Sequence, residues 1–394
     1  MRIAVLKKIW TLLLFLSIFA GCGDKATEPE PPPEQELPIS GFIPLEGPAG
    51  TQVTISGEQF SNIPDSNIVT FGGVRGQVLT ASDSELVAVV PRGALTGEVK
   101  VRSGGLTGIA DESFTVFWTH VALPAGSGTL YDICWTGTQF VAVGTGGTIV
   151  TSPNGEDWTK QPALTSQRYR AVTSKGNSVL AVGDNGVRAV YLSETGWSAG
   201  VIPTTNPVDL AASSAAFVAI PAEGGYVLSS PDGTQWESHA LDSLLPLKVA
   251  IYSDRFVVFS SGLPVFWSYD GGQWNTVVSN LTSPAPFAAA RSGNRVMIAK
   301  INSLLTTTSV ISGIWEDCTP TGSTVYSFRD LVWTGRYFLA VAQEAYWSTG
   351  GTGWRQHSAF DATSSVRPNV VCSSDCCVMV GSFGGDVLVW WFAE

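Results

Sequence analysis

The sequence predicts an all-β protein in which a small antiparallel β-sandwich precedes a seven-bladed β-propeller. Residues 38–117 contain short runs of alternating apolar and polar residues, separated by Gly, Pro, Asn and Asp, a pattern typical of antiparallel strands. A second observation is a repeat of tryptophan at intervals of 38 to 41 residues, and periods near 40 in a β-rich chain indicate propeller blades. The repeat comprises Trp118, Trp158, Trp197, Trp236, Trp274, Trp315 and Trp354.

The first 37 residues predict export and a membrane anchor. Basic residues at Arg2, Lys7 and Lys8 precede an apolar run at 9–20 that is too short to remain as a spanning helix. The four residues Phe19 to Cys22, "FAGC", resemble the lipobox of bacterial lipoproteins. The resemblance implies a signal peptide at 1–21 and acylation of Cys22, and an ordinary signal peptide with a chance cysteine is the alternative. Gly23, in place of Asp after the cysteine, implies the outer membrane in Gram-negative lipoproteins, although Asp24 follows.

The segment 22–37 is acidic and rich in proline, without apolar periodicity. Such a composition prefers extended conformations and cannot form a core. We therefore expect a tether between the lipid and the folded domains.

Residues 38–117 resemble the IPT/TIG family of immunoglobulin-like domains. The resemblance depends on "GPAGTQVTISGEQF", "NIVTFGG", "VVP" and "GEVKV", which occur in the family's order. It implies a spacer or a binding unit, and we expect a spacer because no residue pattern here is typical of catalysis.

Residues 118–394 are predicted to form the propeller. The segment "DICWTGTQFVAVG" at 132–144 aligns without gaps to 330–342 and 209–221. First strands are expected near residues 132, 171, 209, 248, 288, 330 and 369. The last copy ends without a fourth strand, so residues 118–124 are expected to close the ring as the outer strand of the last blade.

Before several blade tryptophans stands a turn such as "SPDGTQW" at 230–236 or "SYDGGQW" at 268–274. These turns resemble the Asp box of BNR and sialidase-type propellers and of Ycf48-like photosystem assembly factors. We expect a structural role, because the acid position is occupied by Asn154, Ile311 and Gly350 in other copies and Asp-Gly suits a tight hairpin. The expected structural set is Ser230, Asp232, Gly233, Trp236, Ser268, Asp270, Gly271 and Trp274.

A ligand is expected on the opposite face, where the long connections between blades lie. Polar residues begin several inner strands there, and they could surround the channel mouth and bind a polar ligand or a cation. The alternative is that these residues only hydrate the channel or satisfy strand ends. The candidate ligand rim is Asp132, Asp209, Lys248, Asp330 and Asn369.

The remaining composition excludes several functions. A formal net charge of −11 argues against nucleic acid as a partner. The cluster "CSSDCC" is expected to form a disulfide from Cys372 to Cys376 or Cys377, with buried free cysteines as the alternative. No zinc spacing is evident, and the three histidines follow tryptophans of different blades, so no metal or cofactor is expected.

The sequence thus predicts a protein that is not an enzyme. We expect a lipid-anchored cell-envelope protein, on the periplasmic or the surface side, that binds a protein or glycan ligand or acts as a scaffold through the propeller face. The alternatives are a degenerate BNR-type glycosidase or lyase acting on surface polysaccharide, because one fold hosts many chemistries, and an envelope complex assembly factor. The paired carboxylates needed for glycoside hydrolysis are not visible.

Overall fold

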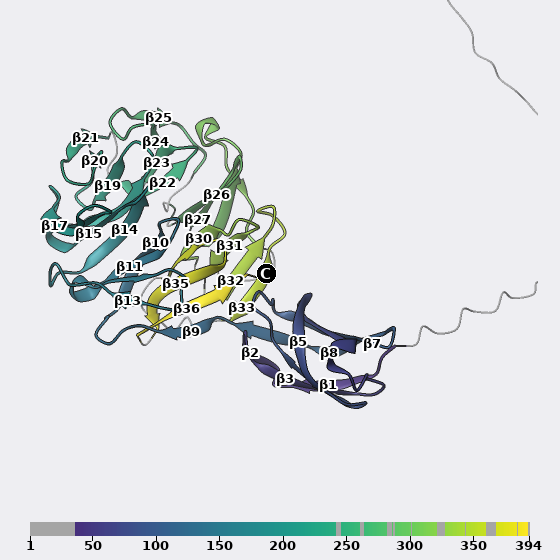
Figure 1. Cartoon of the computed structure of the whole chain (residues 1–394). Coiled ribbons are helices and arrows are strands. Elements are labelled where there is room, and N and C mark those ends of the chain that lie inside the picture. The colour runs from purple at the N-terminus through teal and green to yellow at the C-terminus, as the bar shows by residue number, and fades with distance from the viewer. Residues whose placement is uncertain are drawn as a thin grey trace, which may run out of the picture. The chain divides into compact units, whose positions relative to one another are not determined.

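The regular elements in the described part of the chain are β-strands and four short 3-10 helices (Figure 1). The computed structural model describes residues 36–241, 246–260, 264–281, 286, 288–300, 302–320, 328–342, 344–359, 368–383 and 385–392. The predicted signal peptide, Cys22 and nearly all of the tether lie outside the described residues. None of the described elements is a helix long and apolar enough to cross a membrane.

The first domain has eight strands, hydrogen-bonded in the order β1-β3-β6-β5-β4-β7-β8-β2. Alternating residues of these strands point into one core. In "QVTISG", Val53 and Ile55 are buried, whereas Gln52, Thr54 and Ser56 are more exposed. Phe71 and Phe114 fill the centre of the core with ring centres 5.5 Å apart. The strands are β1 (Ile39–Ile43), β2 (Glu46–Pro48), β3 (Gln52–Gly57), β4 (Asn67–Phe71), β5 (Val74–Ala81), β6 (Glu85–Val89), β7 (Gly97–Ser103) and β8 (Leu106–Phe117), with a 3-10 helix at Pro64–Ser66.

The remaining strands form seven four-stranded antiparallel sheets, as the tryptophan repeat predicted. The first four blades are β10 (Leu130–Trp135), β11 (Phe140–Gly144), β12 (Ile149–Ser152) and β13 (Thr159–Lys160); β14 (Tyr169–Lys175), β15 (Ser178–Gly183), β16 (Val187–Leu192) and β17 (Gly196–Val201); β18 (Pro207–Ala212), β19 (Phe217–Pro221), β20 (Tyr226–Ser230) and β21 (Glu237–Ala240); and β22 (Pro246–Tyr252), β23 (Arg255–Ser260), β24 (Val265–Ser268) and β25 (Asn275–Val277).

The last three blades are β26 (Ala288–Ser292), β27 (Arg295–Lys300), β28 (Ser303–Thr307) and β29 (Glu316–Asp317); β30 (Asp330–Trp333), β31 (Phe338–Val341), β32 (Glu344–Ser348) and β33 (Arg355–Ala359); and β34 (Asn369–Cys372), β35 (Cys376–Phe383), β36 (Asp386–Trp391) and β9 (Thr119–Ala122). Three further 3-10 helices span Thr145–Gly147, Asp184–Gly186 and Val310–Ser312.

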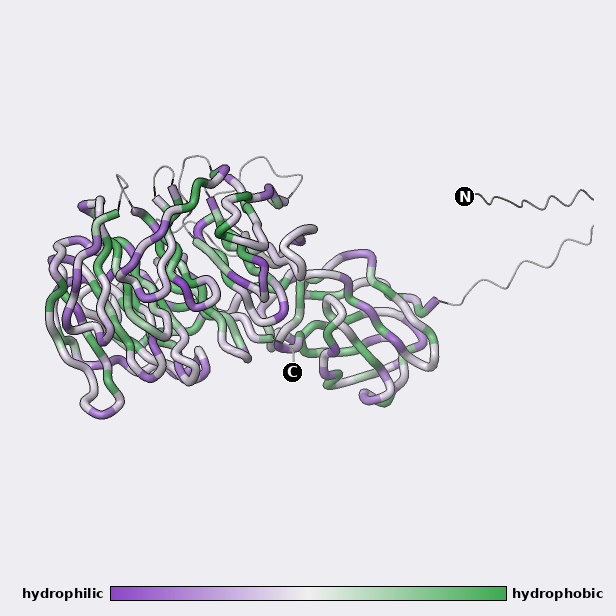
Figure 2. Tube along the Cα trace, turned by 90° about the horizontal axis from the view of Figure 1, so that it is seen from above, coloured by the Kyte–Doolittle hydropathy of each residue, from purple (hydrophilic) through white to green (hydrophobic). Residues whose placement is uncertain are grey.

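The second strand of a blade is buried on both faces. Every residue of β11 and of β19 is buried, because each blade packs between two neighbours and such strands read as continuous apolar runs. The clusters cross from blade to blade: Val141 of blade one packs with Val179 and Ala181 of blade two. In Figure 2 hydrophobic stretches run along the strands, and many of the turns are hydrophilic.

The ring closes through a strand taken from the start of the propeller. β9 pairs antiparallel with β36, with Val121 opposite Val387. Blade seven then packs on blade one, where Val378 and Val389 lie in the same cluster as Phe140. The last blade thereby gains its fourth strand and does not end in an open edge at β36.

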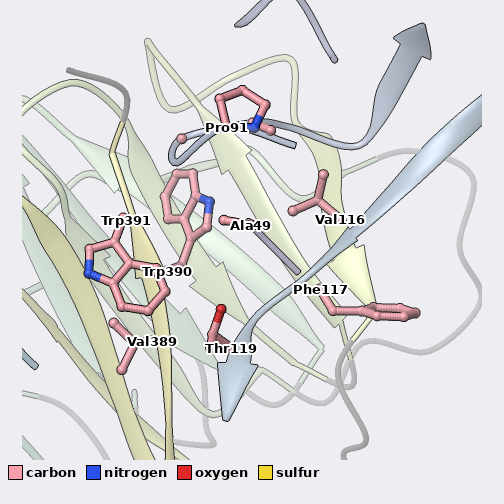
Figure 3. Close-up of a pocket in the computed structure, with 10 residues that line it drawn as sticks. Ala49, Pro91, Val116, Phe117, Thr119, Val389, Trp390 and Trp391 are labelled. Carbon is pink, nitrogen blue, oxygen red and sulfur yellow. The ribbon is translucent and has the colours of Figure 1, made fainter. Parts of the chain in front are cut away.

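The first domain contacts the propeller beside this closure (Figure 3). Ala49 and Pro91 of the first domain and Trp390 and Trp391 of blade seven line one narrow gap, which leaves no room for a ligand. Arg92 lies 4.7 Å from the centre of the Trp391 ring and forms an ion pair with Glu156 of blade one. The junction is thus a packed contact with blades one and seven.

The cysteine cluster contains one disulfide, between Cys372 and Cys377 on neighbouring strands of blade seven. Cys376 points to the other face of β35, into the core shared with blade one, and is free. Cys134 and Cys318 are also free and buried. These three cysteines therefore belong to separate parts of the core.

Candidate functional site

Each blade places one residue at the same position of its inner strand, around the propeller axis. The position is fixed by the ladder with the second strand: Asp132 lies opposite Val143, and Asp209 opposite Ile220. These positions form the channel ring. Its members, in blade order, are Asp132, Ala171, Asp209, Lys248, Ala288, Asp330 and Asn369.

A β-bulge precedes the ring position in the first four blades. The ladder register shifts at Tyr131, Arg170, Val208 and Leu247, so one extra residue stands between the strand start and the ring residue. A bulge breaks the alternation of a strand and re-aims a side chain. These bulge residues therefore stand just above the channel ring, towards the connections between blades.

The three aspartates of the channel ring join neighbouring blades. Asp132 accepts the backbone N–H of Val172 in the next blade at 2.7 Å and that of its own neighbour Ile133 at 2.9 Å. Each aspartate uses one carboxylate oxygen for the backbone of the next blade. The other oxygen accepts from the N–H of the following residue in Asp132 and Asp330, and from Lys248 Nζ in Asp209. The cross-blade bonds pair Asp132 with Val172, Asp209 with Val249 and Asp330 with Val370, each across 40 residues.

Asn369 takes the same position but has an amide group, and it acts as a donor. Its Nδ2 donates to the carbonyl oxygen of Tyr131 and joins blade seven to blade one. In the described part of the chain, side chains of the channel ring thus form hydrogen bonds between blades one and two, three and four, six and seven, and seven and one. These residues thus hydrogen-bond backbone groups of the neighbouring inner strands.

Lys248 lies among the acids. Its Nζ donates to Asp209 at 3.1 Å. Burial by itself would lower the pKa of Lys248, but the carboxylates of Asp209, Asp330 and Asp132 raise it. Lys248 therefore stays protonated at neutral pH and acts as a fixed positive charge in the ring.

Two of the acids hold their protons unusually tightly. Burial raises the pKa of Asp132 to about 7 and that of Asp330 to about 6, although the cross-blade hydrogen bonds and Lys248 act in the opposite direction. Asp132 thus changes its charge near neutral pH, which makes the charge of the channel ring adjustable.

A cavity of about 420 Å³ opens at the channel ring on the side of the bulge residues. This volume lies within the range typical of small-ligand sites. The lining combines polar ring residues, two arginines and an apolar wall, and we call it the mouth cavity. It is lined by Asp132, Arg170, Ala171, Val208, Asp209, Leu247, Lys248, Pro286, Arg329 and Asn369. Asp330 belongs to the channel ring but not to this lining.

A charged group frames one side of the mouth cavity. Asp184 at the start of a 3-10 helix accepts from Arg168 at 2.9 Å and also pairs with Arg170. The Arg168 guanidinium lies 5.1 Å from the ring centre of Tyr131. Two arginines therefore share one carboxylate, and this side of the mouth keeps a positive charge.

The candidate ligand rim predicted from the sequence is brought together on one ring, and whether it binds a ligand stays a prediction. Sequence reasoning missed Arg170, Val208, Leu247 and Arg329, which also line the mouth cavity. They stand one place before the ring residues in the aligned repeats, so a reading of the adjacent column would have found them. Arg170, Val208 and Leu247 lie at β-bulges, which the sequence did not predict. Strict alternation along a strand would direct these side chains away from the channel.

The turns before the blade tryptophans lie at the other end of the blades, between the third and fourth strands. In the turn at 268–274, one oxygen of Asp270 accepts from Ser268 Oγ and from the N–H groups of Gly272 and Gln273. Trp274 Nε1 donates to the carbonyl of Gly271. Asn154 makes the equivalent backbone bonds in blade one at 2.9 Å. These turns need an acceptor at this position rather than a charge.

The turn at 230–236 repeats this geometry. Gly233 N–H donates to Ser230 Oγ at 2.8 Å, Asp232 accepts from Thr234 N–H at 2.7 Å, and Trp236 Nε1 donates to Gly233. Gly233 and Gly271 have φ of +79°, which favours glycine.

The described residues contain no cluster of side chains suited to bind a metal ion. No three His, Cys, Asp or Glu side chains there lie close enough together to hold an ion. His120 is on the closing strand β9, 3.3 Å from Asp386, and His239 on β21 hydrogen-bonds Ser229. Both belong to outer strands of different blades.

Residues 38–115 match the family model of the IPT/TIG domain, and the chain has no significant match among the curated proteins. Solved structures show what the propeller is similar to. YCF48 from Cyanidioschyzon merolae is 18% identical, with 70% of this chain and 98% of that chain covered and a TM-score of 0.53. A structure of YCF48 bound to D1 peptide is also 18% identical, with 70% and 97% covered and a TM-score of 0.55.

A third similar structure is a catalytically inactive variant of virginiamycin B lyase from Staphylococcus aureus with quinupristin. It is 9% identical, with 70% of this chain and 99% of that chain covered and a TM-score of 0.61. At such identities the likeness shows the propeller fold alone. The chain is thus an all-β protein with an immunoglobulin-like IPT/TIG domain and a seven-bladed β-propeller.

Proposed function

We propose that the protein is a lipid-anchored cell-envelope binding module that holds a protein or glycan ligand at the mouth cavity. The observation that carries this proposal is the lining of the cavity, in which arginines, a polar ring and apolar side chains meet in one concave site. Sites of this kind, concave and partly apolar with a few polar groups, are typical of ligand binding. The structure of YCF48 bound to D1 peptide is a precedent for a propeller of similar fold that binds a peptide.

The proposal is non-catalytic. Both oxygens of Asp132 and both of Asp330 already accept hydrogen bonds, two of them from a neighbouring blade. These hydrogen bonds hold the two carboxylates between the blades, and moving either one towards a substrate would open the contacts between blades. Hydrolysis of a sialoside or polysaccharide panel by the purified protein, lost in Asp132→Asn, would overturn this part of the proposal.

The anchor and location rest on the sequence. Acylation of Cys22 would attach the protein because each buried methylene contributes about 0.8 kcal/mol to membrane binding. The turn geometry at 230–236 and 268–274 supports the relation to Asp-box propellers. We propose that the protein lies on the outer membrane, where the propeller presents the mouth cavity to the periplasm or to the surface.

The proposal is tested by capture from envelope extracts with the full chain in detergent. The wild type should retain a ligand that Arg329→Ala loses. Asp270→Asn on the opposite end of the propeller is the matched control and should retain it. Equal retention by all three would show that the mouth cavity is not the site. In cell fractionation, Cys22→Ser should leave the membrane fraction, and an unchanged distribution would refute the anchor.

A further inference from the structure

Arg329 is a cation without a partner in the part of the chain that the structure describes. Its backbone N–H donates to Val341, but its guanidinium makes no hydrogen bond or ion pair with another described residue. The side chain is partly buried and lines the mouth cavity. A guanidinium that lines a cavity and has no partner among the described residues can pair there with an anion supplied from outside.

Arg170 of blade two also lines the mouth cavity and carries positive charge. Arg170 shares the single carboxylate of Asp184 with Arg168, so this trio has one charge left over. Lys248 and Asp209 neutralise each other below. When Asp132 and Asp330 hold their protons, the charges around the mouth cavity therefore sum to a positive value in a chain with a net charge of −11, and the cavity then attracts negative groups.

The acids of the channel ring limit how much negative charge the mouth cavity can accept. Asp132 and Asp330 are the remaining acids of the channel ring, and at pH 8 they carry negative charge that would repel a doubly charged ligand. The groups that interact with Asp132 are Asp209, Lys248, the N–H groups of Ile133 and Val172, and the buried thiol of Cys134. A ligand with one negative charge balances the arginines without demanding that both acids be neutral.

The wall of the mouth cavity is apolar. Val208 and Leu247 stand at β-bulges and line the cavity together with Pro286. The side chains of Val208 and Leu247 are 41% and 42% exposed. Exposed aliphatic side chains inside a cavity favour an apolar group of a ligand. A cationic ligand fits less well, because it would face two arginines and carboxylates whose oxygens already accept donors.

We infer that the mouth cavity binds an organic carboxylate attached to a short apolar group, with the carboxylate between Arg170 and Arg329 and the apolar group against Val208 and Leu247. The inference rests on the proposed function and names the chemistry of its ligand. Arginine binds planar carboxylates through paired N–H donors. Such a carboxylate could be the end of a peptide chain with an apolar last residue or a free short-chain acid.

Calorimetric titration of the full chain in detergent distinguishes these sources. The probes are N-acetyl-Ala-Leu with a free carboxylate, its C-terminal amide, pentanoate and pentanamide, with pentyl phosphate as a comparison that is doubly charged at about pH 8. Each acid that binds should do so at least about tenfold more tightly than its amide, as expected for a lost pair of charged hydrogen bonds. Tighter binding of the dipeptide acid identifies a chain end as the ligand, and tighter binding of pentanoate identifies a free acid.

Three variants make the test specific. Arg329→Gln should weaken acid binding about tenfold and leave the amide unchanged, and Arg329→Lys should recover part of the loss. Arg291→Gln is the control, because Arg291 stacks on Tyr252 on an inner-strand hairpin away from the mouth cavity. Acid binding should strengthen as the pH falls from about 8 to about 6, because protonation of Asp132 removes a repulsive charge.

Several results would overturn the inference. Equal affinity for acid and amide, tighter binding of pentyl phosphate than of either acid, or no binding of any probe would each do so. The proposed function fails separately, when capture of the envelope ligand does not depend on Arg329. If capture of the envelope ligand depends on Arg329 but acid and amide probes bind equally, the protein is a binding protein whose ligand is of another chemical class.

Discussion

The propeller uses aspartate in two ways, at opposite ends of its blades. In the turn at 268–274, a single oxygen of Asp270 accepts two backbone N–H groups and a hydroxyl from its own turn. In the channel ring, Asp330 uses both oxygens, one for its neighbour Leu331 and one for Val370 of the next blade. The turn acid stabilises a local hairpin, whereas the ring acid joins two blades.

The environments give the two acids opposite pKa shifts. The N–H groups of Gln273 and Gly272 lower the pKa of Asp270 on its exposed turn. Burial raises the pKa of Asp330 to about 6 although it also accepts backbone N–H groups. Hydrogen bonds thus prevail at Asp270 on its exposed turn, whereas desolvation outweighs them at Asp330.

The largest expected effect is the loss of a cross-blade bond. Asp330→Ala leaves the N–H of Val370 without its acceptor, and a buried unsatisfied donor costs about 1–3 kcal/mol. We expect the free energy of unfolding to fall by about 2–3 kcal/mol, since the N–H of Leu331 also loses its partner. Chemical denaturation of the full chain in detergent measures it.

The matched control is Asp270→Ala in the turn, whose N–H groups can turn to water. Its cost should be smaller, about 0.5–1 kcal/mol, as for lost turn and cap acceptors. If Asp270→Ala destabilised the protein as much as Asp330→Ala, the distinction between local and cross-blade aspartates would be wrong.

The next effect is a pH dependence of the free energy of unfolding, with opposite signs for the channel-ring acid Asp132 and the turn acid Asp270. The pKa of Asp132 is raised from 3.8 to about 7, so the folded protein holds its proton more tightly than the unfolded chain. Its contribution to stability is complete below pH 3.8 and is lost as the pH rises through about 7. The slope for one proton is at most about 1.4 kcal/mol per pH unit.

Asp132→Asn should flatten the fall in melting temperature between about pH 4 and about pH 7. Its amide oxygen can keep the bond to Val172, so the variant should still fold. The turn acid Asp270, with a lowered pKa, should lose its contribution only below its ordinary pKa of 3.8. An identical decline in Asp132→Asn and the wild type across that range of pH would refute the assignment.

The smallest expected effect belongs to Asp270→Asn. One oxygen of Asp270 carries all three of its turn bonds, and Asn154 already performs the same function in blade one. The change in the free energy of unfolding should stay within about 0.5 kcal/mol at neutral pH. A loss above about 1.5 kcal/mol would mean that the turn needs the charge.

Much of the architecture could be read from the sequence, because its physical causes are local and repeated. The tryptophan period marks the outer strands, and alternation in "QVTISG" predicts Val53 and Ile55 as core residues of the first domain. The channel ring was also partly visible, since Asp132, Asp209 and Asp330 occupy one column of the aligned repeats. Their cross-blade bonds were not visible, because a distance between inner strands of neighbouring blades does not appear in a repeat alignment.

The sequence alone determined the all-β class, the number of blades, and the replaceable acid of the turns, because strand alternation, a period near 40 and turn chemistry act over short distances. Only the tertiary structure decided which side chains share the mouth cavity. Arg170 and Arg329 are 159 residues apart and line one site because the ring of blades brings their inner strands together. The bulges of the first four blades then direct side chains that strict alternation would have placed elsewhere. The charge of Asp132 was decided there too, since its raised pKa comes from burial, which exists only after the blades have packed.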